Sequence, residues 1–470
     1  MEKFKLTKIR IRNAFSFKDA ELDLGKLNII VGPNASGKTN LVNVFRLLKR
    51  ALGTYEEPRL PYLPWWSPRN IAYNFSEETP VQIELNISDE EGHESIYALT
   101  FSVAGGEIRL VRETLQIKGY CSIERYGDII SVCNNIDEKA AKRIYDDLVR
   151  ILRISIPTLK TIAIIAKELQ EDIVNTIMHY AIEVEQKHPL HAILLEKRFT
   201  PISPEGTVYN PDDILRFPLS LLPVVLKLAR TIRKEKLNKK EIPGILMEHL
   251  SPLALPSNTF LNSLRHYIRS LFEKSVILRP LNYTAIRSPV TPRKETALTD
   301  DASNLVSYLY NLYISRRKEW DELHELFNMY FFPEMKLAFR LTETGQVILA
   351  VHENDRELLP PNVPEGAFKV LALLVAIVSK APLIVVDEIE NSLHPKFIEA
   401  LLDLIRESNS MLIATTHSPA VVDAANVEEI VVVERGPEGS KFSRIPEPER
   451  IKKWLRETQV TVSEYVFYGG

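Results

Sequence analysis

One segment, Val31–Asn40, restricts what this chain can fold into more than any other stretch of it. It reads V-G-P-N-A-S-G-K-T-N and lies between a short apolar run (Leu27–Val31) and a run with helical spacing (Leu41–Leu52). We therefore predict a strand, a tight glycine loop and a helix. The spacing is that of the phosphate loop G-x-x-x-x-G-K-[ST], with Gly32, Gly37, Lys38 and Thr39 at its fixed positions. An ordinary glycine-rich turn would not require both flanking elements.

The composition of this loop suits it to hold an anion. Glycine permits backbone angles that a side chain forbids, so successive N–H groups can form a cradle at the positive end of the following helix. Lys38 is placed to reach the β- and γ-phosphates of a bound nucleotide, and the Thr39 hydroxyl is placed to ligate Mg²⁺. The residues predicted to surround the phosphates are Gly32, Pro33, Asn34, Ala35, Ser36, Gly37, Lys38, Thr39 and Asn40.

Composition excludes several classes of protein. A net charge of −3 over 470 residues provides no bulk basic field, so contact with nucleic acid would need a local patch. The 2 cysteines match no zinc spacing and are too few for a disulfide scaffold. No apolar run approaches the roughly 18 residues of a membrane span, and the N-terminus lacks a signal-peptide core. We expect a cytoplasmic protein without a membrane partner.

Hydrophobic periodicity divides the chain into three predicted parts, residues 1–135, 136–275 and 276–470. The first part holds a hairpin and, after the loop segment, an antiparallel meander (Phe4–Ile11 with Ala20–Leu24; Val81–Ser88, Ile96–Val103 and Ile108–Ile117). In the Pro-rich loop before the meander, we expect Trp65 and Trp66 to act as packing anchors. The second part is a compact helical insertion, with helices predicted at Lys139–Leu152, Thr158–Glu185, Leu222–Leu237 and Phe260–Lys274.

The third part alternates strands with helices, which indicates a mostly parallel sheet with covered faces. Its predicted strands are Val276–Arg279, Leu383–Val386, Met411–Thr415 and Glu428–Glu434, with a hairpin formed by Lys336–Leu341 and Val347–His352. Its predicted helices are Asp301–Phe327, Pro364–Ser379 and Pro395–Glu407.

Two of these strands end in side chains that can do chemistry. Pro382–Glu388, P-L-I-V-V-D-E, is a buried strand that delivers two acids to the sheet edge where such folds bind ligands. Asp387 is placed to hold Mg²⁺, and Glu388 to orient and deprotonate a water; a solvated acid is the alternative for Glu388. Met411–Pro419, M-L-I-A-T-T-H-S-P, places His417 within reach of a γ-phosphate, although a lone histidine there is more often structural.

Three motifs together carry a family resemblance. V-G-P-N-A-S-G-K-T-N, V-V-D-E-I-E-N-S-L-H-P and A-T-T-H-S-P are similar to the ABC-type ATPase heads of the SMC, RecF and OLD-like group, especially its short AAA family ATPases. The resemblance covers residues 1–117 and 276–470. It implies an α/β P-loop ABC-ATPase head, with a mixed, mostly parallel sheet, an antiparallel β-lobe and a compact helical insertion domain.

The same resemblance implies a cofactor, a partner and residue roles. Two heads in a homodimer would sandwich ATP with Mg²⁺. Asp387 would help to bind Mg²⁺, Glu388 would be the catalytic acid, and His417 would be the switch histidine. Lys38 would stabilise the charge that develops on the γ-phosphate. The segment Asn391–His394 would be the loop that crosses the dimer interface.

The chain departs from the family at the signature motif. Family heads place a serine at the start of a helix, where it contacts the γ-phosphate of the partner's ATP. The aligned residues here are Pro364, Glu365 and Gly366, so the hydroxyl is missing. The N–H groups of Glu365 and Gly366 at the helix start could still meet an anion. The glutamine of the usual lobe-connecting loop would be Gln82 or Gln116.

Two functions are compatible with these motifs. The first is an ATPase, slow unless two heads pair, that acts in DNA maintenance or anti-virus defence. The second is a nucleotide-gated scaffold that hydrolyses little ATP and holds a separately encoded effector protein. The large insertion and the weak signature argue against a transporter ATPase. In the insertion, the basic stretch Lys227–Lys240 fits a solvated helix end better than a DNA contact, and the apolar run Leu219–Leu228 is either core or a partner face.

Overall fold

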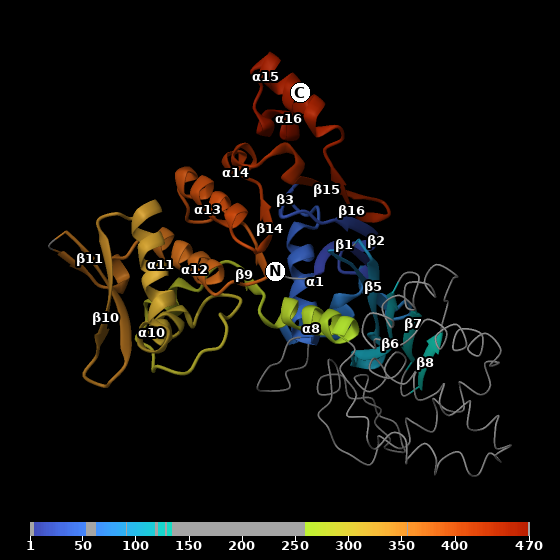
Figure 1. The fold of residues 1–470 in the computed structure, drawn as a ribbon, viewed down its shortest axis with the longest axis horizontal. Coiled ribbons are helices and arrows are strands. Elements are labelled where there is room, and N and C mark those ends of the chain that lie inside the picture. Colours follow the sequence, from blue (N-terminus) through green and yellow to red (C-terminus); the bar gives the residue numbers. More distant parts are fainter. Residues whose placement is uncertain are drawn as a thin grey trace, which may run out of the picture. The chain divides into compact units, whose positions relative to one another are not determined.

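The computed structural model describes residues 4–52, 63–90, 92–117, 121–126, 129–133, 259–354 and 356–468 of the chain. The chain forms two compact units (Figure 1). The larger unit consists of Thr7–Val81 and Arg269–Gly470, and the smaller unit consists of Met1–Leu6 and Gln82–Ile268. The phosphate-loop segment and both predicted strand-end acids therefore belong to the larger unit.

The larger unit is built on a mixed sheet with the strand order β1-β2-β16-β15-β3-β14-β13-β9. These strands are β1 (Phe4–Ala14), β2 (Phe17–Asp23), β3 (Leu27–Val31), β9 (Val276–Leu278), β13 (Leu383–Val386), β14 (Met411–Thr416), β15 (Ile430–Gly436) and β16 (Gly439–Arg444). The neighbours from β15 to β9 pair in parallel, and those from β1 to β15 are antiparallel. The predicted α/β class with a mixed sheet is confirmed.

The described part of the larger unit also contains α-helices. They are α1 (Lys38–Leu52), α9 (Tyr283–Arg287), α10 (Leu305–Ser315), α11 (Arg317–Tyr330), α12 (Glu365–Val378), α13 (Pro395–Glu407), α14 (Pro419–Ala424), α15 (Pro448–Thr458) and α16 (Val462–Tyr468). Alternate residues of β3, Leu27, Ile29 and Val31, share one core cluster with α12 and α13. Helix α1 contacts β9, β13 and β14. Every residue of β3, β13 and β14 is buried, which explains why their sequences are mostly apolar.

In the larger unit, one predicted helix is divided in two and one predicted hairpin has an additional strand. The predicted long helix Asp301–Phe327 is wrong, because the chain leaves helical geometry at Arg316 (φ −132°, ψ 61°) and forms α10 and α11 instead. The predicted hairpin is confirmed as β10 (Met335–Leu341) and β11 (Val347–Glu353), and it gains a third strand, β12 (Arg356–Leu358).

The two tryptophans of the Pro-rich loop behave differently. The ring of Trp65 lies 5.5 Å from that of Phe15 and 5.4 Å from the Arg46 guanidinium, so the expected packing role is confirmed for Trp65. Trp66 is 91% exposed, and the same expectation is wrong for it.

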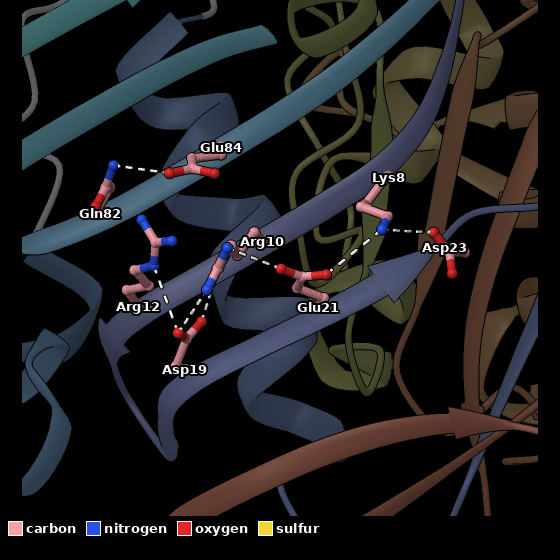
Figure 2. A network of polar contacts seen from close by, with 8 residues as sticks. All are labelled: Lys8, Arg10, Arg12, Asp19, Glu21, Asp23, Gln82 and Glu84. Atoms are coloured by element: carbon pink, nitrogen blue, oxygen red, sulfur yellow. Dashed lines mark hydrogen bonds and ion pairs between the residues drawn. The ribbon is translucent and has the colours of Figure 1, made fainter.

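The hairpin of β1 and β2 is held in register by a ladder of opposite charges (Figure 2). Lys8 pairs with Glu21 and Asp23, and Arg10 pairs with Asp19 and Glu21. Exposed pairs of this kind contribute at most about 1 kcal/mol each, so their main effect is to favour one pairing of the strands. The hairpin predicted from the sequence is confirmed, and its register fixes where the connecting turn lies.

The smaller unit contains the predicted meander. The three predicted strands correspond to β4 (Val81–Asp89), β5 (Glu94–Ser102) and β6 (Arg109–Ile117). Two further strands, β7 (Cys121–Tyr126) and β8 (Ile129–Cys133), were not predicted. Antiparallel pairing joins β5, β6, β7 and β8 in that order.

Much of the predicted insertion falls outside the described residues. Its last predicted helix is confirmed as α8 (Thr259–Glu273). The other predicted helices, the basic stretch and the apolar run all lie between residues 134 and 258, which the structure does not describe. The three-part division of the chain therefore stays a prediction. Within the described ranges, no helix has both the length and the apolar composition needed to cross a membrane.

Candidate nucleotide-binding site

The phosphate loop follows β3 and is shaped by close packing around two glycines. At Gly32 a Cβ atom would lie 2.2 Å from the carbonyl oxygen of Val433, and at Gly37 it would lie 2.6 Å from Ser440 Oγ. Gly37 also has a φ of +114°, which side-chain-bearing residues rarely adopt. The loop conformation therefore depends on both glycines. Of the other loop residues, Pro33, Asn34, Ala35 and Thr39 are exposed, Asn40 is half-buried, and Ser36 is buried.

Lys38 is the first residue of α1 and lies buried beneath the loop. Its Nζ donates hydrogen bonds to the carbonyl oxygens of Gly32 (2.7 Å) and Pro33 (2.9 Å). Burial lowers the pKa of the ammonium group, whereas the nearby acids raise it (Glu388, Glu390 and Asp387). The ammonium thus lies against the loop and within the field of the acids that follow β13.

Asp387 is hydrogen-bonded to residues from both the N-terminal and the C-terminal parts of the chain. The Thr39 hydroxyl donates to Asp387 Oδ1 at 3.2 Å, and the buried Thr415 hydroxyl donates to the same oxygen at 2.7 Å. The Asp387 N–H donates to the Leu278 carbonyl oxygen at 2.8 Å. Asp387 is 4% exposed; its carboxylate accepts from α1 and β14, and its backbone is bonded to β9. A hydroxyl and a carboxylate in contact are the hard oxygen ligands that suit Mg²⁺.

Glu388 is held in a backbone conformation that is costly for a glutamate. Its φ is +50°, and its N–H donates to Thr415 Oγ1 at 2.8 Å. The Asn391 amide donates to Glu388 Oε2 at 2.6 Å. The strained backbone turns the chain directly after Asp387, and Asn391 orients the half-buried carboxylate.

His417 follows β14 and lies beside the same turn. Its N–H donates to Glu390 Oε1 at 3.0 Å, and its ring Nδ1 lies 3.4 Å from that oxygen. The side chain is 52% exposed, so one ring edge remains open to solvent. The structure therefore brings His417 next to the acidic turn, and its reach to a γ-phosphate stays a prediction.

The start of α12 contacts another loop of the same chain. Ser392 Oγ donates to Glu365 Oε2 at 3.2 Å, and Arg287 Nη1 lies 3.5 Å from Glu365 Oε1. A Cβ at Gly366 would lie 2.6 Å from the Ser392 carbonyl oxygen. Pro364 caps the helix without a side-chain hydrogen bond. Among the described hydrogen bonds, none joins Glu365 or Gly366 to the phosphate loop.

Sequence reasoning missed three residues that organise this site. Thr415 bonds both Asp387 and the Glu388 backbone, Asn391 bonds Glu388, and Glu390 bonds His417. The available signal was the position of Thr415, which comes directly after the apolar run Met411–Ala414, just as Asp387 comes directly after Leu383–Val386. Both glutamine candidates, Gln82 and Gln116, belong to the smaller unit.

Two protein-family models match the chain. The model described as "AAA ATPase domain" matches residues 4–200. The model described as "AAA domain, putative AbiEii toxin, Type IV TA system" matches residues 203–423. The first match contains the phosphate loop, and the second contains Asp387, Glu388 and His417. Both models describe AAA domains, and together they match most of the chain.

The matches among solved structures include SMC head domains. The Smc head domain of Pyrococcus furiosus, solved with an extended coiled coil and bound to the C-terminal domain of ScpA, is 13% identical, with a TM-score of 0.43. The alignment covers 97% of this chain and 100% of that one. The SMC head domain of Thermotoga maritima is 12% identical, with 94% and 99% covered and a TM-score of 0.38. Likenesses at this level establish no shared activity. No curated protein matches the sequence.

Proposed function

We propose that this ATPase head binds ATP with Mg²⁺ at the phosphate loop and hydrolyses it, with Glu388 as the general base. The convergence of the Thr39 and Thr415 hydroxyls on Asp387, beside Lys38, is the observation that supports the proposal most strongly. This arrangement would let an ammonium, a hydroxyl and two carboxylates surround phosphates held by the loop. This is the set of groups that phosphoryl transfer to water requires.

Each residue of the site would have one task. Backbone N–H groups of the loop would bind the phosphate oxygens, and Lys38 would balance their charge. Thr39 and Asp387 would hold Mg²⁺, which would neutralise charge on the β- and γ-phosphates. Glu388 would orient a water for in-line attack and accept its proton, held in place by Asn391.

Phosphate release tests this proposal. Wild type should release phosphate in the presence of ATP and Mg²⁺, whereas Lys38→Ala and Glu388→Gln should release little. Glu399→Gln, which changes an exposed acid of α13, serves as the matched control and should behave as wild type. Equal rates in all four proteins would exclude hydrolysis at this site.

The ATPase head is further proposed to act as a homodimer in the cytoplasm, in DNA maintenance or anti-virus defence. Light scattering of Glu388→Gln should show a doubling of mass when ATP and Mg²⁺ are added, because the variant keeps ATP bound between paired heads. Adding a DNA duplex to the same samples reports any DNA complex. An unchanged monomer mass with saturating ATP would contradict the dimer, and no DNA complex in either state would contradict the DNA role.

A second function, a nucleotide-gated scaffold for an effector protein, is favoured by the start of α12. Pro364 supplies no hydroxyl there, and Glu365 is held within its own chain by Ser392 and Arg287. A helix start that is bonded within its own chain is less available to contact ATP on a partner head. This would favour ATP binding over ATP turnover. Tight ATP binding by wild type with phosphate release no faster than that of Glu388→Gln would select this function over the first.

A further inference from the structure

Helix α12 carries a buried lysine, Lys369, that has no task in the proposed reaction. The Lys369 side chain is 1% exposed, and its Nζ has no hydrogen-bond partner among the described residues. Burial lowers its pKa to about 8, although three acids oppose the shift (Glu390 most, then Asp387 and Glu388). A buried ammonium without a bonded partner is costly, and an apolar side chain would fill the same space without that cost. Packing alone therefore does not explain Lys369.

Glu390, the acid that raises the pKa of Lys369 most, has one carboxylate oxygen without a described hydrogen-bond partner. Glu390 Oε2 is buried and, within the described part of the chain, lacks a hydrogen-bond partner. The other oxygen, Oε1, accepts the His417 N–H at 3.0 Å and lies 3.4 Å from the His417 ring Nδ1. Glu390 therefore touches His417 with one oxygen, and its other oxygen is, like Lys369 Nζ, a buried polar atom without a bonded partner among the described residues.

We propose that Lys369 and Glu390 are positioning residues for His417. Lys369 is the buried counter-charge of Glu390, and Glu390 holds the ring with its Nδ1–H toward the carboxylate. The nitrogen left for a bound nucleotide is then Nε2, which can donate to a phosphate oxygen when the ring carries both protons. A carboxylate behind a histidine fixes the tautomer and orientation of the ring in this way at many functional sites. The proposal rests on the proposed function in one respect, because it assumes that His417 faces the γ-phosphate.

The histidine tautomer tests the proposal without any hydrolysis. The chain has 10 histidines, so ¹⁵N-histidine spectra of wild type and His417→Gln identify the His417 signal by its loss. We expect wild-type His417 to be mainly the Nδ1–H tautomer when neutral. Glu390→Gln and Lys369→Met should both shift the balance toward Nε2–H. An unchanged tautomer balance in both variants would overturn the proposal.

Kinetics provide the second test. Lys369→Met and Glu390→Gln should each lower kcat about tenfold with little change in the KM for ATP, as expected for residues that act through another. The double variant should be no slower than the slower single variant, because both changes break one link. Lys453→Met is the matched control, since Lys453 is 78% exposed on α15, and it should leave kcat unchanged. Additive losses, or an unchanged kcat, would contradict the proposal.

Stability separates positioning from a structural role. Lys369→Met alone leaves the buried Glu390 carboxylate without its counter-charge, whereas the double variant with Glu390→Gln removes both charges, so we expect the thermal midpoint of the double variant to equal or exceed that of wild type. A midpoint of the double variant that falls together with kcat would assign the pair to the structure and overturn the proposal. Failure of hydrolysis itself is recognised separately, because Lys38→Ala and Glu388→Gln would then match wild type whatever the tautomer spectra show.

Discussion

Replacing Glu388 by glutamine should lower kcat for ATP hydrolysis by about 10²- to 10⁴-fold, the usual contribution of a general base. Glutamine keeps the shape of the side chain and can still accept the Asn391 hydrogen bond, so the turn after Asp387 should be preserved. Because Glu388 is expected to contact the attacking water and not the nucleotide, ATP affinity should change little. Single-turnover phosphate release and calorimetric ATP binding measure the two effects separately.

The exposed acid Glu399 again provides the control, and Glu399→Gln should alter neither quantity. A loss of ATP affinity that accounts for the whole loss of turnover in Glu388→Gln would show that Glu388 supports binding. A kcat within twofold of wild type would remove Glu388 from the mechanism.

Replacing Lys38 by alanine should weaken ATP binding by about 10- to 100-fold. A hydrogen bond to a charged group contributes about 1.5–3 kcal/mol, and each 1.4 kcal/mol corresponds to roughly a factor of ten. The Lys38 ammonium is hydrogen-bonded to the carbonyl oxygens of Gly32 and Pro33 in the loop. Phosphates bound by the loop would therefore lie close enough to contact it. Titration of a fluorescent ATP analogue measures the affinity.

Lys453→Ala, an exposed change on α15, should bind ATP as wild type does. Circular dichroism of Lys38→Ala should match wild type, because the lost bonds are replaceable by water. An unaltered affinity in a folded Lys38→Ala protein would place the nucleotide elsewhere.

The local parts of this site were predictable because their signals are local. The phosphate loop is contiguous, and its glycines, lysine and threonine have a fixed spacing. Asp387 and Glu388 follow an uninterrupted apolar strand, and parallel strands deliver their carboxyl ends to one edge. These two facts were sufficient to expect Thr39 near Asp387, which lies 348 positions away.

The contacts that complete the site depend on strand register, which the sequence does not specify. Val386 pairs with Ala414, so Thr415 comes level with Asp387 and can bond it. A shift by one residue would turn Thr415 to the other face of the sheet. The pairing of Arg46 with Asp300 at 2.7 Å depends in the same way on tertiary packing.

Hydrophobic periodicity also did not reveal where a helix is interrupted or which loop side chain is buried. The apolar periodicity continues across Arg316, but the residue leaves helical geometry and separates α10 from α11. Trp66 shows that an aromatic side chain in a Pro-rich loop need not be buried, since its neighbour Trp65 makes the packing contacts.

The central claim is that residues from both ends of the chain hold one metal-bound triphosphate, and metal-dependent ATP binding by Asp387→Asn tests it most directly. Wild type should bind ATP more tightly with Mg²⁺ than with a chelator. Asp387→Asn should lose that gain and bind chelated ATP as wild type does, because asparagine keeps the oxygen that accepts from Thr39 and Thr415. A full Mg²⁺ gain in Asp387→Asn, equal to that of the exposed control Asp321→Asn, would contradict the account.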